Sequence, residues 1–190
     1  MINKIGLREY FLSLNTKKEV TKVIDLSEYT KQLSKLFSSG SNILLISHIN
    51  PDGDAIGSQI ALYQFLTTQG KKVSMLTPNY LQEFLKWMEG SDNIYIFIRD
   101  RKKCRTLIKS ADLIVMLDFN QPNRMGEAEA LVIESRARKV LIDHHLDPAD
   151  FADLTISESS MCSTSELVHE LICLLNGEIF MNKPYAEALY

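Results

Sequence analysis

The chain has 190 residues, of which 45% are hydrophobic and 24% are charged, which is the composition of a globular domain with its own core. Its 24 acidic and 21 basic side chains give a net charge of −3, so it lacks the basic excess of proteins that bind long nucleic acid. It contains no apolar run approaching a membrane helix of about 18 residues and no signal-peptide core, which predicts a cytoplasmic protein without a membrane partner.

The beginning of the chain carries no strong motif, and residues 1–24 are predicted to be an N-terminal extension. Residues 25–190 are predicted to form one domain. Apolar residues at helical spacing predict a helix over residues 26–37, with Ser27 as its cap, and the following Ser-Ser-Gly ends it.

The next stretch is the centre of the sequence, because an apolar strand runs there into a turn with one histidine and two aspartates. Residues 43–46 read as a strand buried on both faces. The turn at residues 51–53 stops it, and Asp54 stands where a helix cap belongs. His48, Asp52 and Asp54 therefore share one strand-to-helix crossover. Turn and cap preferences alone also account for both aspartates, so this crossover leaves function open.

Further strands and helices alternate along the chain. Strands are predicted over residues 71–76, 94–98, 113–117, 140–142 and 151–156. Helices are predicted over residues 81–88, 101–110, 127–138 and 163–175, with another capped by Asn182. The helix over residues 163–175 is expected to begin with a capping box of Ser163 and Glu166. The apolar stripe of residues 81–88 and Trp87 are interpreted as core, and the basic residues near 101–105 as a solvated face. The alternation predicts an α/β fold with a mainly parallel sheet flanked by helices on both faces.

Acidic and histidine side chains recur where these strands end. His48 follows the first buried strand, Asp118 follows another, and Asp143, His144 and His145 follow a third. Because the carboxyl ends of parallel strands meet at one edge of a sheet, these residues are expected to converge on one crevice. His169 lies inside a predicted helix, away from every strand end, and is interpreted as structural.

Aspartates and imidazoles without thiolates suit manganese, magnesium or zinc. The set exceeds the needs of one ion, and a shared carboxylate would place two ions about 3.5–4 Å apart, the arrangement of two-metal phosphoryl displacement. Phosphoester hydrolysis is therefore the predicted reaction. The chain has no serine nucleophile elbow and no glycine-rich phosphate loop to support the main alternatives.

Three segments, SHINPDGDAIGS, the aspartate of MLDFNQPNRMG, and IDHH, together resemble the first three motifs of the DHH phosphoesterase superfamily. The resemblance runs from about residue 43 to the end. Within the superfamily, NPDGDAIGS looks most like the branch of small oligoribonucleases and pAp phosphatases called nanoRNases. The first motifs of RecJ exonucleases and family II pyrophosphatases differ from it.

The resemblance implies a role for each matching residue. His48 and Asp52 would bind one manganese ion, Asp54 and His144 a second, and Asp118 both. Asp143 would orient a histidine, and His145 would contact the scissile phosphate. Ser163 and Thr164 match a small polar segment that lies near the substrate in relatives.

Two family features have no counterpart in this sequence. One is a fourth motif, an aspartate that completes the second metal site, and the other is a C-terminal domain, rich in glycine and histidine, that grips the nucleotide. We therefore expect that these 190 residues are a fragment of a longer polypeptide. We also expect them to bind the second metal weakly and to hydrolyse poorly.

The leading functional hypothesis is a manganese-dependent phosphoesterase that acts on short oligonucleotides or on 3′-phosphoadenosine 5′-phosphate (pAp). Magnesium or another divalent ion is an alternative cofactor. A pyrophosphatase or a phosphodiesterase of cyclic or linear dinucleotides is the alternative within the superfamily. A non-catalytic nucleotide- or metal-binding domain is the alternative outside it. The oligomeric state stays open, with a homodimer as one expectation.

Overall fold

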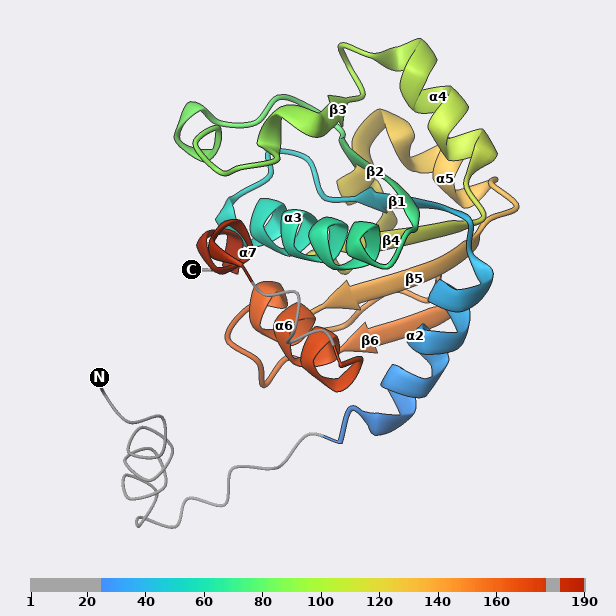
Figure 1. The fold of residues 1–190 in the computed structure, drawn as a ribbon. Coiled ribbons are helices and arrows are strands. Elements are labelled where there is room, and N and C mark those ends of the chain that lie inside the picture. Colours follow the sequence, from blue (N-terminus) through green and yellow to red (C-terminus); the bar gives the residue numbers. More distant parts are fainter. Residues whose placement is uncertain (1–24, 177–181, 190) are drawn as a thin grey trace.

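The computed structural model describes residues 25–176 and 182–189 (Figure 1). The predicted extension over residues 1–24 lies outside the described residues, so the domain boundary at residue 25 stays a prediction. Within the two described ranges, no helix combines the length and the apolar character that crossing a bilayer requires.

The centre of the fold is a six-stranded sheet in which every pair of neighbouring strands is parallel. Its order is β3-β2-β1-β4-β5-β6. The strands are β1 (Asn42–Ile46), β2 (Lys72–Thr77), β3 (Ile94–Ile96), β4 (Leu113–Leu117), β5 (Arg138–Asp143) and β6 (Leu154–Ser157). The predicted α/β class and parallel sheet are confirmed.

Helices cover both faces of this sheet, as Figure 1 shows. One face carries α2 (Ser27–Ser39), α3 (Gly53–Thr68), α6 (Thr164–Leu174) and α7 (Lys183–Leu189). The other carries α4 (Arg101–Ser110) and α5 (Glu129–Ile133). Short 3₁₀ helices lie at η1 (Glu83–Leu85), η2 (Ser91–Asn93) and η3 (Pro122–Ala128).

The position of β1 in the sheet explains why residues 43–46 are all apolar. Ile43 and Leu45 belong to the core beneath α3 and α6, whereas Leu44 and Ile46 belong to the core beneath α4. Successive side chains of a strand point to opposite faces, so a strand covered on both sides must be apolar at every position. Each such burial stabilises the fold by about 1.5–3 kcal/mol.

The order of the strands also fixes where a site can form. The chain leaves β1 through α3 to reach β2 on one side, while β4 lies on the other side and leads on to β5. These opposite directions open a crevice at the carboxyl ends of β1 and β4, which is where ligands bind in open α/β sheets.

Two predicted helix caps are wrong. Asp52, and not Asp54, caps α3, because its Oδ1 accepts the Ala55 N–H at 3.1 Å. The Ser27 side chain does not cap α2. Asp25 instead accepts the Ser27 N–H at 3.0 Å. Both aspartates of the first crossover were plausible caps by residue type, so only backbone geometry could choose between them.

Two predicted helices are shorter than their patterns suggested. Residues 81–88 contain only the 3₁₀ turn Glu83–Leu85. In residues 127–138 the α-helix is limited to α5, since the range starts at the end of η3 and ends at the first residue of β5. The second helix ends early because β5 already begins at Arg138, which pairs with Leu113 at the start of β4. The interpretation of Trp87 and Phe84 as core is also wrong, because they are 61% and 63% exposed.

The two caps predicted near the end of the described residues are present. Ser163 Oγ accepts the Glu166 N–H at 3.0 Å, and Asn182 Oδ1 accepts the Tyr185 N–H at 2.9 Å. The capping box is displaced by one residue, because the Glu166 carboxylate accepts from the Cys162 N–H at 2.7 Å. Ser163 therefore fixes where α6 begins.

The contact between α3 and α7 depends on a glycine. A Cβ atom at Gly57 would lie 2.0 Å from the Ala188 carbonyl oxygen, whereas one at Gly53, on the same helix, would meet nothing within 4 Å. We expect Gly57→Ala to displace α7 and to raise amide hydrogen exchange over Lys183–Leu189. Gly53→Ala is the matched control and should leave exchange unchanged. Equal exchange in both variants would contradict this packing.

Candidate metal centre

The carboxyl edge of the sheet brings His48, Asp52 and Asp118 together. His48 Nε2 lies 3.4 Å from Asp118 Oδ2 and 3.9 Å from Asp52 Oδ1. These residues come from the loops after β1 and β4, the two strands that border the crevice. The distances leave room for a cation among the three side chains and put their ligand atoms within 4.8 Å of one another.

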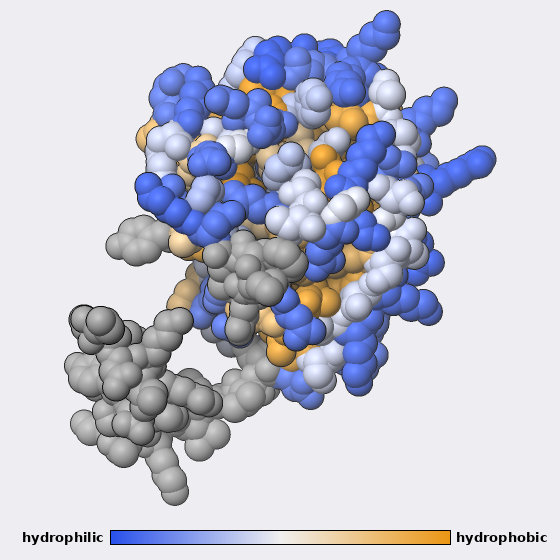
Figure 2. Space-filling model, in the orientation of Figure 1, coloured by the Kyte–Doolittle hydropathy of each residue, from blue (hydrophilic) through white to orange (hydrophobic). Residues whose placement is uncertain are grey.

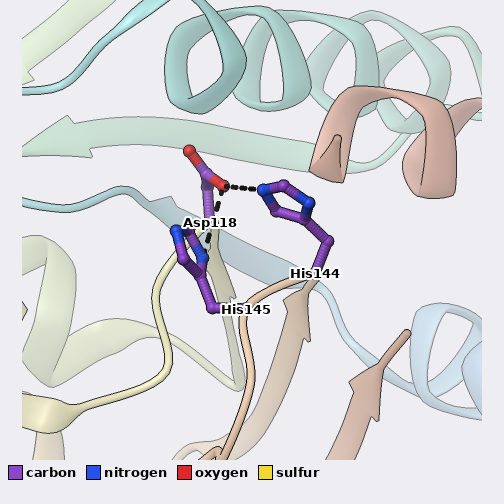
Figure 3. Close-up of side chains that lie close together, drawn as sticks. All are labelled: Asp118, His144 and His145. Carbon is purple, nitrogen blue, oxygen red and sulfur yellow. Dashed lines mark ion pairs between the residues drawn. The ribbon is translucent and has the colours of Figure 1, made fainter. Parts of the chain in front are cut away.

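A second group forms on the other oxygen of Asp118. His144 Nε2 lies 3.9 Å from Asp118 Oδ1 and 3.7 Å from Asp54 Oδ2. Figure 3 shows His144 and His145, from the loop after β5, both directed at the Asp118 carboxylate. One carboxylate thus stands between two histidines that come from different strand ends.

His145 is held differently from His144. Its Nδ1 lies 2.7 Å from Asp143 Oδ1, so the Nδ1 proton is donated to that carboxylate. Asp143 is fully buried, and its Oδ2 has no hydrogen-bond partner in the described part of the chain. The His145 side chain remains 49% exposed, which leaves its Nε2 available to a ligand in the crevice.

The tautomer of His48 follows from its backbone contact. Its Nδ1 lies 2.7 Å from the Ile49 carbonyl oxygen, which requires a proton on Nδ1. Nε2 therefore carries the lone pair in the neutral ring, and in the charged ring its proton is donated to Asp118. Burial by itself lowers the pKa of this imidazole. The hydrogen bonds to Asp118 and to the Ile49 carbonyl outweigh that effect, and the pKa is raised above its ordinary value of 6.5.

Asp118 is the most constrained carboxylate of the group. It is 2% exposed and has a left-handed backbone with φ 68°, which aspartate tolerates better than most residues. Burial raises its pKa, and the charge of Asp54 adds to this, while the bond to His48 opposes it. Thr164 Oγ1 donates to its Oδ1 at 2.8 Å. A bound cation would compensate the buried negative charge.

Asp54 joins this site to the start of α6. Its Oδ2 accepts the Thr164 N–H at 2.8 Å, and its Oδ1 accepts the Ser165 N–H at 2.7 Å. A carboxylate at a helix N-terminus satisfies backbone donors that have no partner within the helix. Of the two predicted substrate-binding residues, Thr164 is fully buried against Asp118, and Ser163 caps the helix.

Arg124 is a residue of this site that the sequence motifs did not predict. Its Nη2 lies 3.1 Å from His48 Nδ1, and its carbonyl oxygen accepts the Ile49 N–H at 2.8 Å. Since Nδ1 already carries the proton given to Ile49, the guanidinium keeps its own donors free for another acceptor. Arg124 follows Asp118 by six residues, but the motif around Asp118 assigns no role to this arginine.

The donor set fits divalent cations. Two groups of three side chains have the spacing of a metal site, and Asp118 belongs to both. The groups are Asp118 with His144 and His145, and Asp118 with His48 and Asp52. In the first group the His145 Nδ1 is bonded to Asp143, so Asp54, 3.7 Å from His144, is the better third ligand. Carboxylate oxygens and imidazole nitrogens suit manganese, magnesium or zinc.

A family model and several known proteins match the part of the chain that holds these residues. A family model described as the DHH family, N-terminal domain, matches residues 42–190. The chain is 31% identical over 140 residues to the bifunctional oligoribonuclease and PAP phosphatase NrnA of Thermus thermophilus, which covers 72% of this chain and 38% of that protein. It is 28% identical over 148 residues to the cyclic-di-AMP phosphodiesterase GdpP of Geobacillus thermodenitrificans, covering 74% and 22%.

Solved structures also resemble this chain. An exopolyphosphatase-related protein from Bacteroides fragilis is 43% identical, with a TM-score of 0.86, over 90% of this chain and 50% of that one. The exonuclease RecJ bound to manganese has a TM-score of 0.53 at 16% identity, over 87% and 41%, and shares the fold alone. This chain spans less than half the length of either curated relative.

Proposed function

Because this chain belongs to the DHH family, we propose that it is the catalytic domain of a metal-dependent phosphoesterase acting on short oligonucleotides and on pAp. The observation that carries the proposal is the buried Asp118 carboxylate, which faces a histidine on each oxygen. The name of the Thermus thermophilus relative, an oligoribonuclease and PAP phosphatase, supports the choice of substrates.

We assign the ligands from the distances around Asp118. His48 and Asp52 hold one ion, Asp54 and His144 hold the other, and Asp118 contacts both. Manganese is the proposed metal, with magnesium as the alternative. When bound, such a pair of cations lowers the pKa of a water molecule and neutralises charge on the phosphoryl oxygens.

The protein's own side chains would then position the substrate. His145 is held by Asp143 through Nδ1, so its half-exposed ring offers Nε2 to a phosphate oxygen. Arg124 places a guanidinium at the edge of the same crevice. Asp143 acts as a positioning residue, because a buried carboxylate fixes both the tautomer and the orientation of its histidine.

A substrate panel tests this assignment. With manganese, the protein should release 5′-mononucleotides from dinucleotides or phosphate from pAp faster than it cleaves pyrophosphate or cyclic di-AMP. The similarity to a cyclic-di-AMP phosphodiesterase makes cyclic di-AMP the main competitor. If the protein bound nucleotides but hydrolysed none of these substrates, the enzyme proposal would be wrong and a nucleotide sensor would be the better interpretation.

Removal of the Arg124 charge should weaken substrate binding and leave metal binding intact. We expect Arg124→Gln to lower kcat/KM for pAp by about tenfold to a hundredfold, the range of one lost hydrogen bond between charged groups. Manganese affinity should be at least as high as before, since a nearby cation is gone. Arg105→Gln, on the exposed surface of α4, is the control for charge alone. Equal losses in the two variants would contradict this role.

Manganese affinity should rise with pH. The pKa of His48 lies above 6.5, so its Nε2 is protonated at about pH 6, and this proton must leave before the nitrogen can bind a metal. Calorimetric titration should therefore give weaker binding at about pH 6 than at about pH 8. His169→Asn removes a histidine outside the site and should keep the same dependence. Affinity that falls over this interval would exclude His48 as a ligand.

A further inference from the structure

Phe84 and Trp87 are exposed on a turn that is otherwise well packed. They are 63% and 61% exposed, whereas Leu81, Leu85 and Met88 of the same segment are buried. Backbone hydrogen bonds from the Lys86 N–H to Glu83 and from the Met88 N–H to Leu85 close this turn. The two aromatic rings are therefore held outward by a fixed backbone.

Both rings line a cleft that reaches the metal centre. The cleft has a volume of about 380 Å³. Besides the two rings, it is lined by polar and small residues and by four aliphatic ones: Gly53, Asp54, Ser163, Ser165, Glu187, Leu85, Met88, Ala188 and Leu189. Asp54 is the carboxylate that faces His144 at 3.7 Å. The aromatic turn and the first residues of α3 and α6 thus line one space, which includes Asp54. In Figure 2, blue hydrophilic residues dominate the outline of the face in view, and white and orange residues lie between them.

We propose that Phe84 and Trp87 form a stacking surface for the nucleobase next to the phosphate at the metal centre. The proposal rests on the proposed function, because it takes the phosphate to lie near Asp54. Aromatic side chains stack on any base, since every base has a π-face, and this stacking is worth a large factor in affinity. The volume of the cleft lies within the range of small-ligand sites.

A nucleobase is favoured over a purely apolar protein partner because the lining is mixed. Aromatic and aliphatic side chains lie beside the polar residues Asp54, Ser163, Ser165 and Glu187. A planar ring joined to a phosphodiester offers both an apolar face and a polar end to such a lining. Because stacking depends on ring area and not on particular base edges, purines should bind better than pyrimidines.

The cleft can be monitored directly, because Trp87 is the single tryptophan of the chain. We would titrate the protein, in magnesium and with no turnover, with AMP and with ribose 5-phosphate, which has the same phosphate and no base. AMP is expected to quench the fluorescence of Trp87, and ribose 5-phosphate to leave it unchanged. Phe84→Ala should weaken AMP binding by about fivefold to a hundredfold, the range of one lost base-aromatic stack.

Tyr80→Ala is the matched control. Tyr80 is also an exposed aromatic residue, at 57%, but it lines a different pocket, so its removal should not change AMP binding. Equal quenching by ribose 5-phosphate, or equal affinity in Phe84→Ala and the unchanged protein, would overturn the stacking surface. A fluorescence shift that depends on protein concentration without nucleotide would assign the cleft to a second copy and overturn it too.

The two proposals fail separately. Base-dependent quenching without hydrolysis of pAp or dinucleotides would reject the phosphoesterase and support the stacking surface. Manganese-dependent hydrolysis without base-dependent quenching would reject the stacking surface alone.

Discussion

Asp118→Asn is expected to reduce manganese affinity by at least about a hundredfold and to abolish phosphoester hydrolysis. Replacing an outer-shell partner of a metal ligand already costs about tenfold to a hundredfold. Asp118 is the side chain shared by both metal groups, so its loss should exceed that range. Asparagine keeps the size of the side chain and tolerates the left-handed backbone at φ 68°, so the fold should persist.

Asp112→Asn is the matched control for that variant. Asp112 immediately precedes β4, whereas Asp118 follows it, so the two carboxylates lie at opposite ends of one strand. Asp112 accepts the backbone N–H groups of Ser41 and Asn42 and lies far from the carboxyl edge. Calorimetry should give an unchanged manganese affinity for Asp112→Asn. The same affinity in Asp118→Asn would remove the basis of the proposed two-metal site.

Asp54→Ala should have two effects, one on metal binding and one on the stability of the metal-free protein. Its carboxylate accepts two backbone N–H groups at the start of α6, and a hydrogen bond to a charged group contributes about 1.5–3 kcal/mol. We expect the free energy of unfolding to fall by about 2–4 kcal/mol, because water replaces part of the loss. Asp54→Asn keeps one acceptor oxygen and should lose about half of that.

Urea unfolding in the presence of a chelator separates these effects. Asp52→Ala serves as the comparison, because Asp52 is also a proposed ligand but accepts only the Ala55 N–H as a helix cap. Loss of such a cap costs about 1 kcal/mol. If Asp54→Ala were no less stable than Asp52→Ala without metal, the anchoring of α6 by Asp54 would be disproved.

The fold could be predicted largely because it follows local patterns. Residues 113–117 are apolar at every position, and burial on both faces leaves a parallel sheet as the simplest structure. The convergence of His48, Asp118 and His144 also followed from topology, since all three come after parallel strands. Their roles as ligands are a proposal that rests on the distances around Asp118.

What could not be predicted depends on contacts between distant segments. Asp52 and Asp54 are both good caps by type, and only the docking of α6 onto Asp54 gives them separate tasks. Phe84 fits a helical stripe of apolar residues, and Trp87 is a large ring that usually lies in a core. The segment forms only one 3₁₀ turn, however, and leaves both side chains exposed. Arg124 reaches His48 only because the loop after β4 folds back against Ile49.

The bond between Asp54 and Ser165 spans 111 positions of the chain and has a consequence for biosynthesis. The ribosome synthesises Asp54 early. Its hydrogen-bond partners at the start of α6 are synthesised more than 100 residues later. A nascent chain released before that point would expose the Asp54 carboxylate without the Thr164 and Ser165 N–H groups that hold it. Loading of the ion assigned to Asp54 and His144 should therefore come late, after α6 has formed.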